Sequence, residues 1–297
     1  MRICRKCRTS NLILRDVSNK ALRYGLLFCF VFLLAGCAKK FLYSNIDWFV
    51  LDYLEDYVSL QGEQEVLVEE RLLLLADWHK KEELPLYIEH LKDLERLKAS
   101  DITLNYLQQN RDRMRAHYDR VVSKAAPDLF ALSLQLTKEQ EREFLSNVQE
   151  HYQERNAKYA DRTEDEVREI ILDNTEEWME EWLGNLSGNQ RQLAQTFSQQ
   201  VILNSPLWRD YRATVYQELE YLFDNKSNVV TYQDIFMRLL FEPESYYSEQ
   251  LSQNIDSNFA LVDQLTLDVS RSMTDKQWRH FREKVKEWRV LAEELLD

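Results

Sequence analysis

The chain has 297 residues, a formal net charge of −13 and 44% hydrophobic residues. A chain of this size can build a hydrophobic core without disulfide bonds. Its acidic charge repels phosphate backbones, so we expect no nucleic acid among its partners.

Residues 1–36 have the order of a secretory signal, with a basic start followed by an apolar stretch. Seven basic residues lie between Arg2 and Arg23, and nine apolar residues run from Leu26 to Leu34. A helix that spans a bilayer needs about 20 residues, so an uncleaved membrane anchor is the weaker interpretation.

The sequence Leu33-Leu34-Ala35-Gly36-Cys37 ends this stretch and resembles the lipobox of bacterial lipoproteins. The resemblance implies that a signal peptidase cuts between Gly36 and Cys37, and that Cys37 becomes the lipidated first residue. More than one acyl chain is needed for stable attachment to a membrane. Ala38, rather than Asp, after the cysteine implies export to the outer membrane, where the protein would face the periplasm.

Cleavage would change both the charge and the cysteine content of the protein. Residues 1–36 contain seven basic residues and one acidic residue, so their removal changes the net charge from −13 to −19. Cys4, Cys7 and Cys29 would be lost, and lipidation would consume the thiol of Cys37. The remaining chain, 37–297, therefore has to fold without a disulfide bond.

The rest of the sequence favours helices. Glycine occurs there only at positions 62, 184 and 188, and no run alternates as a strand does. A Ser or Thr followed three residues later by Glu or Gln is typical of a helix start, and this pattern begins at Thr137, Thr163, Ser187 and Thr274. We predict an all-α fold: one elongated multi-helix bundle of packed helical hairpins.

The expected helices can be given in chain order, with prolines 85 and 206 as first helical residues. They cover Asn45–Val58, Glu63–Glu82, Pro85–Lys98, Asp101–Lys124, a short helix from Pro127, Thr137–Leu183 with a break near 161–163, Ser187–Leu203, Pro206–Phe223, a short helix from Thr231, Tyr246–Arg271 and Thr274–Leu296.

Aromatic and apolar residues mark the first and last of these helices. Phe41, Tyr43 and Trp48 closely follow Cys37, which suits either the lipid headgroup level or an ordinary core helix. In the last helix, apolar residues recur every three or four positions and predict one buried face; they are Trp278, Phe281, Val285, Trp288, Ala292 and Leu295. We expect this face to pack against the preceding helix.

Two resemblances to known families follow. The segments 43–48, 52–58 and Ala76–Tyr87 resemble the start of a family of bacterial lipoproteins that is defined as a domain of unknown function. That resemblance implies a helical lipoprotein and supplies no activity.

The second resemblance concerns Leu136-Thr137-Lys138-Glu139-Gln140, which is similar to the LTxxQ motif of the Spy and CpxP family of periplasmic chaperones and stress sensors. Looser copies begin at Leu186 and Met273, and a poorer one without the hydroxyl begins at Leu60. The resemblance implies binding of unfolded clients, whereas the alternative is that each copy is simply a helix cap.

The sequence contains no motif that indicates catalysis. It has no phosphate-binding glycine loop, nucleophile elbow or zinc-protease helix. His79 and Glu83 lie one helical turn apart and could share a ligand, but a metal needs three or four convergent ligands. We therefore expect no catalytic, cofactor or metal site. The expected function is a non-enzymatic scaffold or accessory factor with an envelope protein partner; a chaperone or stress sensor is the alternative.

Overall fold

The computed structural model describes residues 45–296, which form helices joined by short turns and contain no β-strand. The predicted all-α class is confirmed. Gly36 and Cys37, the predicted cleavage and lipidation residues, lie outside the described residues. Within residues 45–296, no helix is both long enough and apolar enough to cross a membrane.

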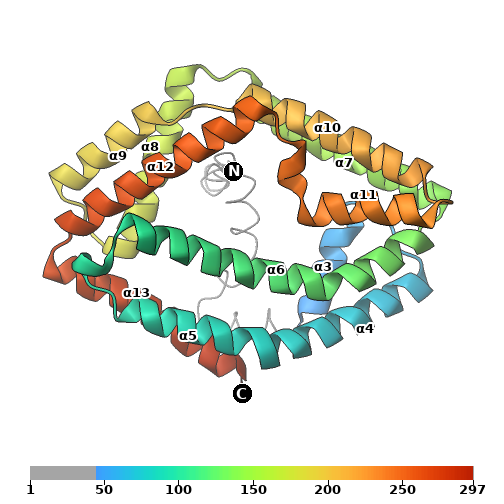
Figure 1. The fold of residues 1–297 in the computed structure, drawn as a ribbon, viewed down its shortest axis with the longest axis horizontal. Helices are drawn as coiled ribbons and strands as arrows, with labels where there is room; N and C mark the ends of the chain where they lie inside the picture. Colours follow the sequence, from blue (N-terminus) through green and yellow to red (C-terminus); the bar gives the residue numbers. More distant parts are fainter. Residues whose placement is uncertain (1–44, 297) are drawn as a thin grey trace, which may run out of the picture.

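The helices are numbered along the chain as in Figure 1. They are α3 (Ile46–Glu55), α4 (Gly62–Trp78), α5 (Leu84–Glu95), α6 (Leu104–Gln135), α7 (Lys138–Ala160), α8 (Glu164–Leu183), α9 (Gly188–Gln200), α10 (Ser205–Asp224), α11 (Val229–Phe241), α12 (Glu249–Ser272) and α13 (Asp275–Leu296). A π-helical turn, His79–Glu83, joins α4 to α5, and short 3-10 turns cover Ala99–Asp101 and Pro243–Tyr246.

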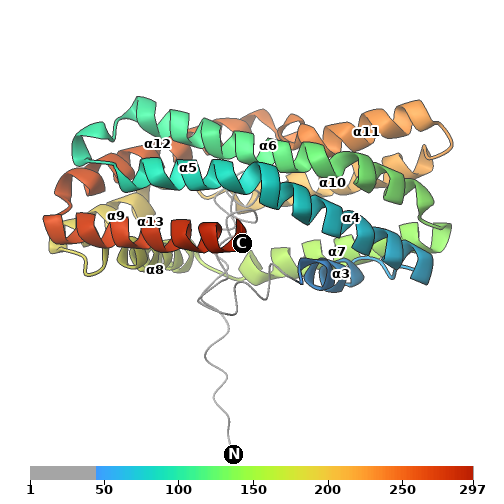
Figure 2. The same ribbon diagram turned by 90° about the horizontal axis from the view of Figure 1, so that it is seen from below.

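The helices are arranged as an elongated closed frame rather than around one central core (Figure 1). One long wall contains α8, α9 and α12 followed by α7 and α10, and the other contains α4, α5, α6 and α13. The walls meet at both ends, where several helix turns come together. Seen from the side, α3, α7, α8 and α13 lie in one layer, and α6, α11 and α12 lie in the other (Figure 2).

The hydrophobic core is divided into clusters around this frame. One lies between α6, α7, α10 and α11 and includes Tyr232, which is fully buried, and Phe223. Another joins α8, α9 and α12 around Met179 and Ala194. Because each cluster links neighbouring helices, the frame is stabilised piece by piece along its length.

Capping chemistry sets several helix starts, as the sequence predicted. Thr137, Thr163 and Ser187 each accept a hydrogen bond from the backbone N–H three residues later. The side chain at that third position, Gln140 or Gln190 among them, accepts the N–H of the capping residue in return. Such a reciprocal pair of bonds is a capping box, and it satisfies backbone N–H groups at the helix start that have no partner within the helix.

The predicted helix break before Pro127 is wrong, whereas Pro85 lies in the first turn of α5, as predicted. Pro127 lies inside the continuous helix α6, between Ala126, which is 3% exposed, and Phe130, which packs into the core. Burial of these neighbours offsets the one backbone hydrogen bond that proline cannot make. What differs from the prediction is the connection before Pro85: a π-helical turn joins α4 to α5 without an intervening loop.

The predicted apolar stripe of α13 is buried, but its expected partner is wrong. Ala292 and Leu295 pack against Leu84 and Ile88 of α5, rather than against α12. Helix α12 instead packs against α9 through Val269 and Ala194. The stripe reveals which face of α13 is buried; which distant helix covers it depends on the global arrangement.

Candidate functional site

The turn His79–Glu83 is the most unusual backbone feature of the described chain. The N–H of Leu84 bonds to the carbonyl of His79, five residues earlier, which is the π-helical pattern. Pro85 follows Leu84 and has no backbone N–H. The wider turn therefore lies directly before a position that could not donate a normal helical hydrogen bond. Such turns often occur at functional sites. Here the turn directs Glu83 inward, where it is 0% exposed.

Glu83 receives hydrogen bonds from two side chains of α6. Arg120 donates to both carboxylate oxygens, from Nε at 2.7 Å and from Nη2 at 2.8 Å. Nδ1 of His117 lies 2.5 Å from Oε1 of Glu83. A buried carboxylate is costly unless it is paired and hydrogen-bonded, and these two partners meet that requirement.

The cluster continues from His117 to His90 on α5. Nε2 of His117 lies 3.2 Å from Nδ1 of His90, and Nε2 of His90 lies 2.7 Å from Oδ1 of Asn110. In this orientation of the Asn110 amide, His90 donates to Asn110 and accepts from His117. Nδ1 of His117 also lies 2.7 Å from Nη2 of Arg120. We call these five residues, Glu83, His90, Asn110, His117 and Arg120, the polar cluster.

Burial shifts the pKa values of the ionisable groups in and beside the polar cluster. Burial lowers the pKa of His90 from 6.5 to about 4, and it does the same to the neighbouring His79. Burial alone would raise the pKa of Glu83, but hydrogen bonds from His117 and Arg120 outweigh it and lower that pKa. The cluster therefore favours an ionised carboxylate beside a neutral His90.

The polar cluster is closed to solvent at its histidines. His90 is 5% exposed and His117 is 3% exposed, and the ring of Tyr87 lies edge-on to His117 at 4.6 Å. Within residues 45–296, no group of three or more His, Cys, Asp or Glu side chains is arranged to hold a metal ion. The chemistry of this cluster is internal: it joins α5 to α6 at the π-helical turn.

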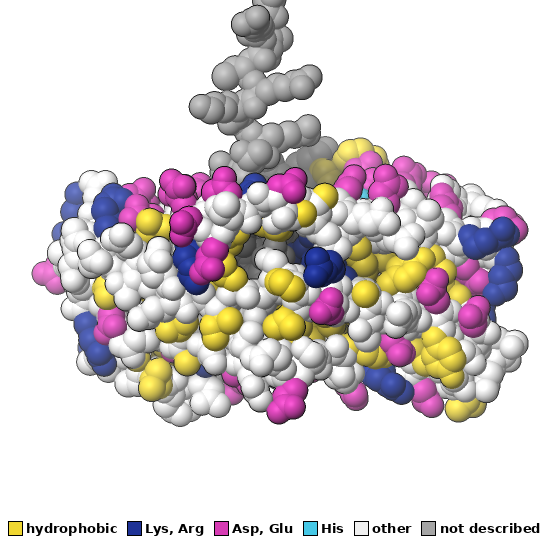
Figure 3. Space-filling view, turned by 90° about the horizontal axis from the view of Figure 1, so that it is seen from above, with side chains coloured by type: hydrophobic (Ala, Val, Ile, Leu, Met, Phe, Trp, Pro, Cys, Tyr) yellow, Lys and Arg dark blue, Asp and Glu magenta, His cyan; other side chains and the backbone are white. Residues whose placement is uncertain are grey.

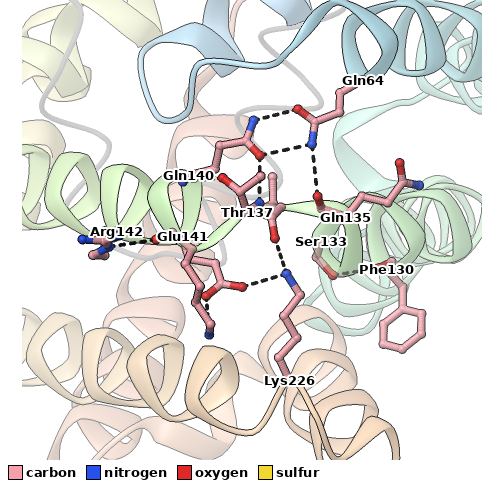
Figure 4. A network of polar contacts seen from close by, with 11 residues as sticks. Gln64, Phe130, Ser133, Gln135, Thr137, Gln140, Glu141, Arg142 and Lys226 are labelled. Atoms are coloured by element: carbon pink, nitrogen blue, oxygen red, sulfur yellow. Dashed lines mark hydrogen bonds and ion pairs between the residues drawn. The ribbon is translucent and has the colours of Figure 1, made fainter.

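The glutamines of the LTxxQ-like motifs form a second kind of polar contact. Gln64 and Gln140 donate to each other, with Nε2–Oε1 distances of 3.1 and 2.7 Å (Figure 4). Each Nε2 also donates to a backbone carbonyl of the other turn, that of Gln135 or Ser59. We call such a reciprocal pair a glutamine clasp.

The same arrangement recurs at the opposite end of the frame. Gln190 and Gln277 donate to each other, with Nε2–Oε1 distances of 3.2 and 2.8 Å. Nε2 of Gln277 also donates to the carbonyl of Asn185, and Nε2 of Gln190 to the hydroxyl of Ser272. The four motif copies therefore pair two by two, and each pair closes one end of the frame.

A buried ion pair reinforces the first clasp. Glu141, 3% exposed, follows Gln140 and accepts from Nζ of Lys226 at 2.7 Å (Figure 4). Lys226 also donates to the carbonyl of Leu136. Lys138 contacts the same carboxylate from the surface at 2.7 Å. The turn between α10 and α11 is thereby tied to the turn between α6 and α7.

The structure brings together some residues that stand far apart in the sequence. Glu83 and His117 bond to each other at the π-helical turn, with His79 close enough to interact electrostatically. His151 of α7 instead lies beside Tyr57, and His280 reaches the carbonyl of Glu181. Sequence reasoning missed the links from His117 to His90 and Arg120. The i,i+3 spacing of His117 and Arg120 was the available signal, because such residues share a helix face.

A family model matches residues 56–252, about two thirds of the chain, and its description is a family of unknown function, DUF6279. The chain belongs to DUF6279. The predicted membership of a family defined as a domain of unknown function is confirmed. No match was found among curated proteins or among solved structures.

The DUF6279 match places most of these contacts within the family region. It contains the polar cluster, the Gln64–Gln140 clasp and the Lys226–Glu141 pair. It ends within α12, so Gln277 and the helix α13 lie beyond it. The second clasp therefore joins the family region to the C-terminal helix.

Proposed function

We propose that this protein is a non-enzymatic envelope lipoprotein, anchored by lipid on Cys37 at the outer membrane and facing the periplasm. It acts there through protein contacts, as a scaffold or accessory factor. The lipobox of residues 33–37 supports the anchor. The DUF6279 match contributes a family and no activity.

The observation that carries the non-enzymatic interpretation is the internal use of the clustered polar side chains. Within each clasp and within the polar cluster, the side chains bond to one another across neighbouring elements, and their glutamines and histidines are buried. General acid or base catalysis needs a group within reach of a substrate. These groups instead hold the frame together.

The surface offers contacts of another kind. Figure 3 shows hydrophobic side chains in patches below a rim of acidic side chains. On α4, Leu73 and Leu74 are 48% and 60% exposed, and on α11 Val230 is 71% exposed. Exposed apolar patches are typical of protein-interaction surfaces. They suit a dedicated partner, and they also suit the alternative of a chaperone or stress sensor of the LTxxQ type.

Crosslinking in intact cells, followed by purification of the protein and mass spectrometry of attached proteins, tests the proposal. We expect one dominant partner in a fixed ratio to the lipoprotein. A broad set of unfolded envelope proteins that grows after envelope stress would favour the chaperone instead. The Cys37→Ser variant is the control for anchoring: normal acyl labelling and membrane fractionation of that variant would contradict the proposed lipid attachment.

A further inference from the structure

Helix α3 presents aromatic side chains to solvent although it lies in a folded part of the chain. Trp48 is 58% exposed and Tyr53 is 54% exposed. The two residues are five positions apart along α3, about 1.4 helical turns, so their directions differ by roughly 140° around the helix axis. Trp and Tyr are the side chains that favour the boundary between water and lipid, because each joins an apolar ring to a polar group.

The end of α3 is held firmly, so these side chains have a defined place on the molecule. Val58, just after the helix, is 5% exposed, and the carbonyl of Tyr57 accepts a hydrogen bond from Asn147 of α7 at 3.0 Å. The N–H of Ser59 donates to the carboxylate of Glu143 at 3.1 Å. In Figure 2, α3 lies in the same layer as α7, α8 and α13.

The short distance along the chain between the proposed anchor and α3 indicates that the surface contacted by these side chains is lipid. Ile46, the first residue of α3, comes nine positions after Cys37. Nine residues span at most about 30 Å when fully extended. An acyl anchor on Cys37 therefore keeps Trp48 and Tyr53 near lipid headgroups, and the short tether raises their effective concentration at that surface.

The charge of α3 and of its neighbours α7 and α8 indicates which lipid headgroups fit; α13, in the same layer, is mixed, with six basic and five acidic residues. Helix α3 contains no lysine or arginine, and its Asp52 and Glu55 are exposed. The rim that contains α7 and α8 is also acidic in Figure 3, with exposed Glu150 and Glu177. Like charges repel, so anionic headgroups are disfavoured.

We propose that α3 docks on a zwitterionic lipid surface through Trp48 and Tyr53, so that the layer containing α3, α7, α8 and α13 faces the membrane. This inference rests on the proposed function, because it needs the lipid anchor on Cys37. It adds an orientation: the opposite layer, with α6, α11 and α12, is directed into the periplasm and is available to protein partners.

Tryptophan fluorescence of the full-length acylated protein in phosphatidylcholine vesicles tests the docking. The acyl chains carry bromine near the headgroup, because bromine quenches tryptophan only at short range. We expect quenching that is lost in Trp48→Ala and is weakened when anionic lipid is added. Trp178→Ala is the comparison variant, since Trp178 is 49% exposed on α8 in the same layer; because docking is through α3, this variant should lose much less of the quenching than Trp48→Ala. Circular dichroism checks that both variants fold.

The outcomes separate the docking from the anchor. Mass spectrometry of the N-terminal peptide first establishes whether Cys37 carries acyl chains. If it does, and Trp48→Ala is quenched as strongly as the native protein, the docking is overturned and the proposed function stands. Equal loss of quenching in Trp178→Ala would also overturn it. An unmodified Cys37 would overturn the docking and the anchor together.

Discussion

Gln190 and Gln277, 87 positions apart, each donate a side-chain hydrogen bond to Oε1 of the other. The same Oε1 atoms accept the backbone N–H of Ser187 and of Thr274, which cap α9 and α13. One amide group thus caps a helix and joins it to a distant turn. Helix start and frame closure are therefore coupled at these residues.

Replacing one member of this clasp should destabilise the whole frame. In Gln277→Ala, the N–H of Thr274 loses its acceptor and the carbonyl of Asn185 loses its donor, while the fully buried amide of Gln190 keeps Ser272 but loses its other partner. Each unsatisfied group costs about 1–3 kcal/mol. We expect the free energy of unfolding, measured in urea, to fall by that amount or more.

A surface glutamine provides the control for this measurement. Gln264 is exposed on α12 and donates to Asp268 one turn later. Gln264→Ala should change the free energy of unfolding by no more than about 0.5 kcal/mol. Equal effects of the two substitutions would show that the clasp contributes nothing beyond ordinary helix contacts.

The clasps also show what the sequence could and could not predict. The capping boxes at Thr137 and Ser187 were predicted because cap chemistry depends only on residues three positions apart. The pairing of Gln140 with Gln64 was not predicted, since it depends on how the chain returns across 76 positions. The copy containing Gln64 is the poorest match because it lacks the hydroxyl, yet Gln64 still accepts the N–H of Gln61, the N-cap residue of α4.

The polar cluster, and the question of which helices pack together, could not be predicted from the sequence for the same reason. His79 and Glu83 are recognisable as a local pair, but Glu83 is satisfied by His117 and Arg120 from another helix. The buried face of α13 followed from periodicity, whereas its contact with α5 did not. Local spacing predicts faces and caps; it carries no information about which distant faces meet.

Breaking the ion pair beside the first clasp should be far more costly than removing its surface neighbour. Lys226 and Lys138 both contact Glu141, but their side chains are 17% and 68% exposed. Lys226→Met leaves a buried carboxylate without its main partner, which costs about 3–5 kcal/mol. Lys138→Met removes an exposed pair, which costs about 0–1 kcal/mol.

Thermal and urea unfolding of these two variants check the difference. The double variant Lys226→Met with Glu141→Leu should recover part of the lost stability, because no buried charge then remains unpaired. If Lys138→Met proves as damaging as Lys226→Met, the buried position of Lys226 does not matter and the explanation is wrong.

The π-helical turn should depend on the charge of Glu83. Glu83→Gln keeps the shape of the side chain but weakens the charge-assisted bonds from Arg120 and His117. Loss of such bonds costs about 1.5–3 kcal/mol. Glu82→Gln, at the exposed neighbouring position, should have little effect. Urea unfolding measures both, and similar values for the two variants would contradict a role for the buried carboxylate.

Mild acid should destabilise the protein through His90. Its pKa is about 4 in the folded protein because it is buried, against 6.5 for the ordinary side chain. Between these values the unfolded chain binds more protons than the folded protein, so the free energy of unfolding falls as the pH falls. A tenfold difference in proton affinity between the folded and the unfolded protein changes the free energy of unfolding by up to about 1.4 kcal/mol. His90 therefore accounts for roughly 3 kcal/mol between pH 7 and pH 4.

Urea unfolding at pH 7, 6, 5 and 4 should show this decline, and His90→Gln isolates its source. Glutamine can still bond to Asn110 and His117 but does not titrate, so the slope above pH 4.5 should become shallower, with the remainder due to His79, whose pKa burial also lowers to about 4. Glu83, whose pKa lies below its ordinary value of 4.5, adds its own loss only at lower pH. An unchanged slope between pH 6.5 and pH 4.5 in His90→Gln would place the acid sensitivity elsewhere, with His79 the next residue to replace.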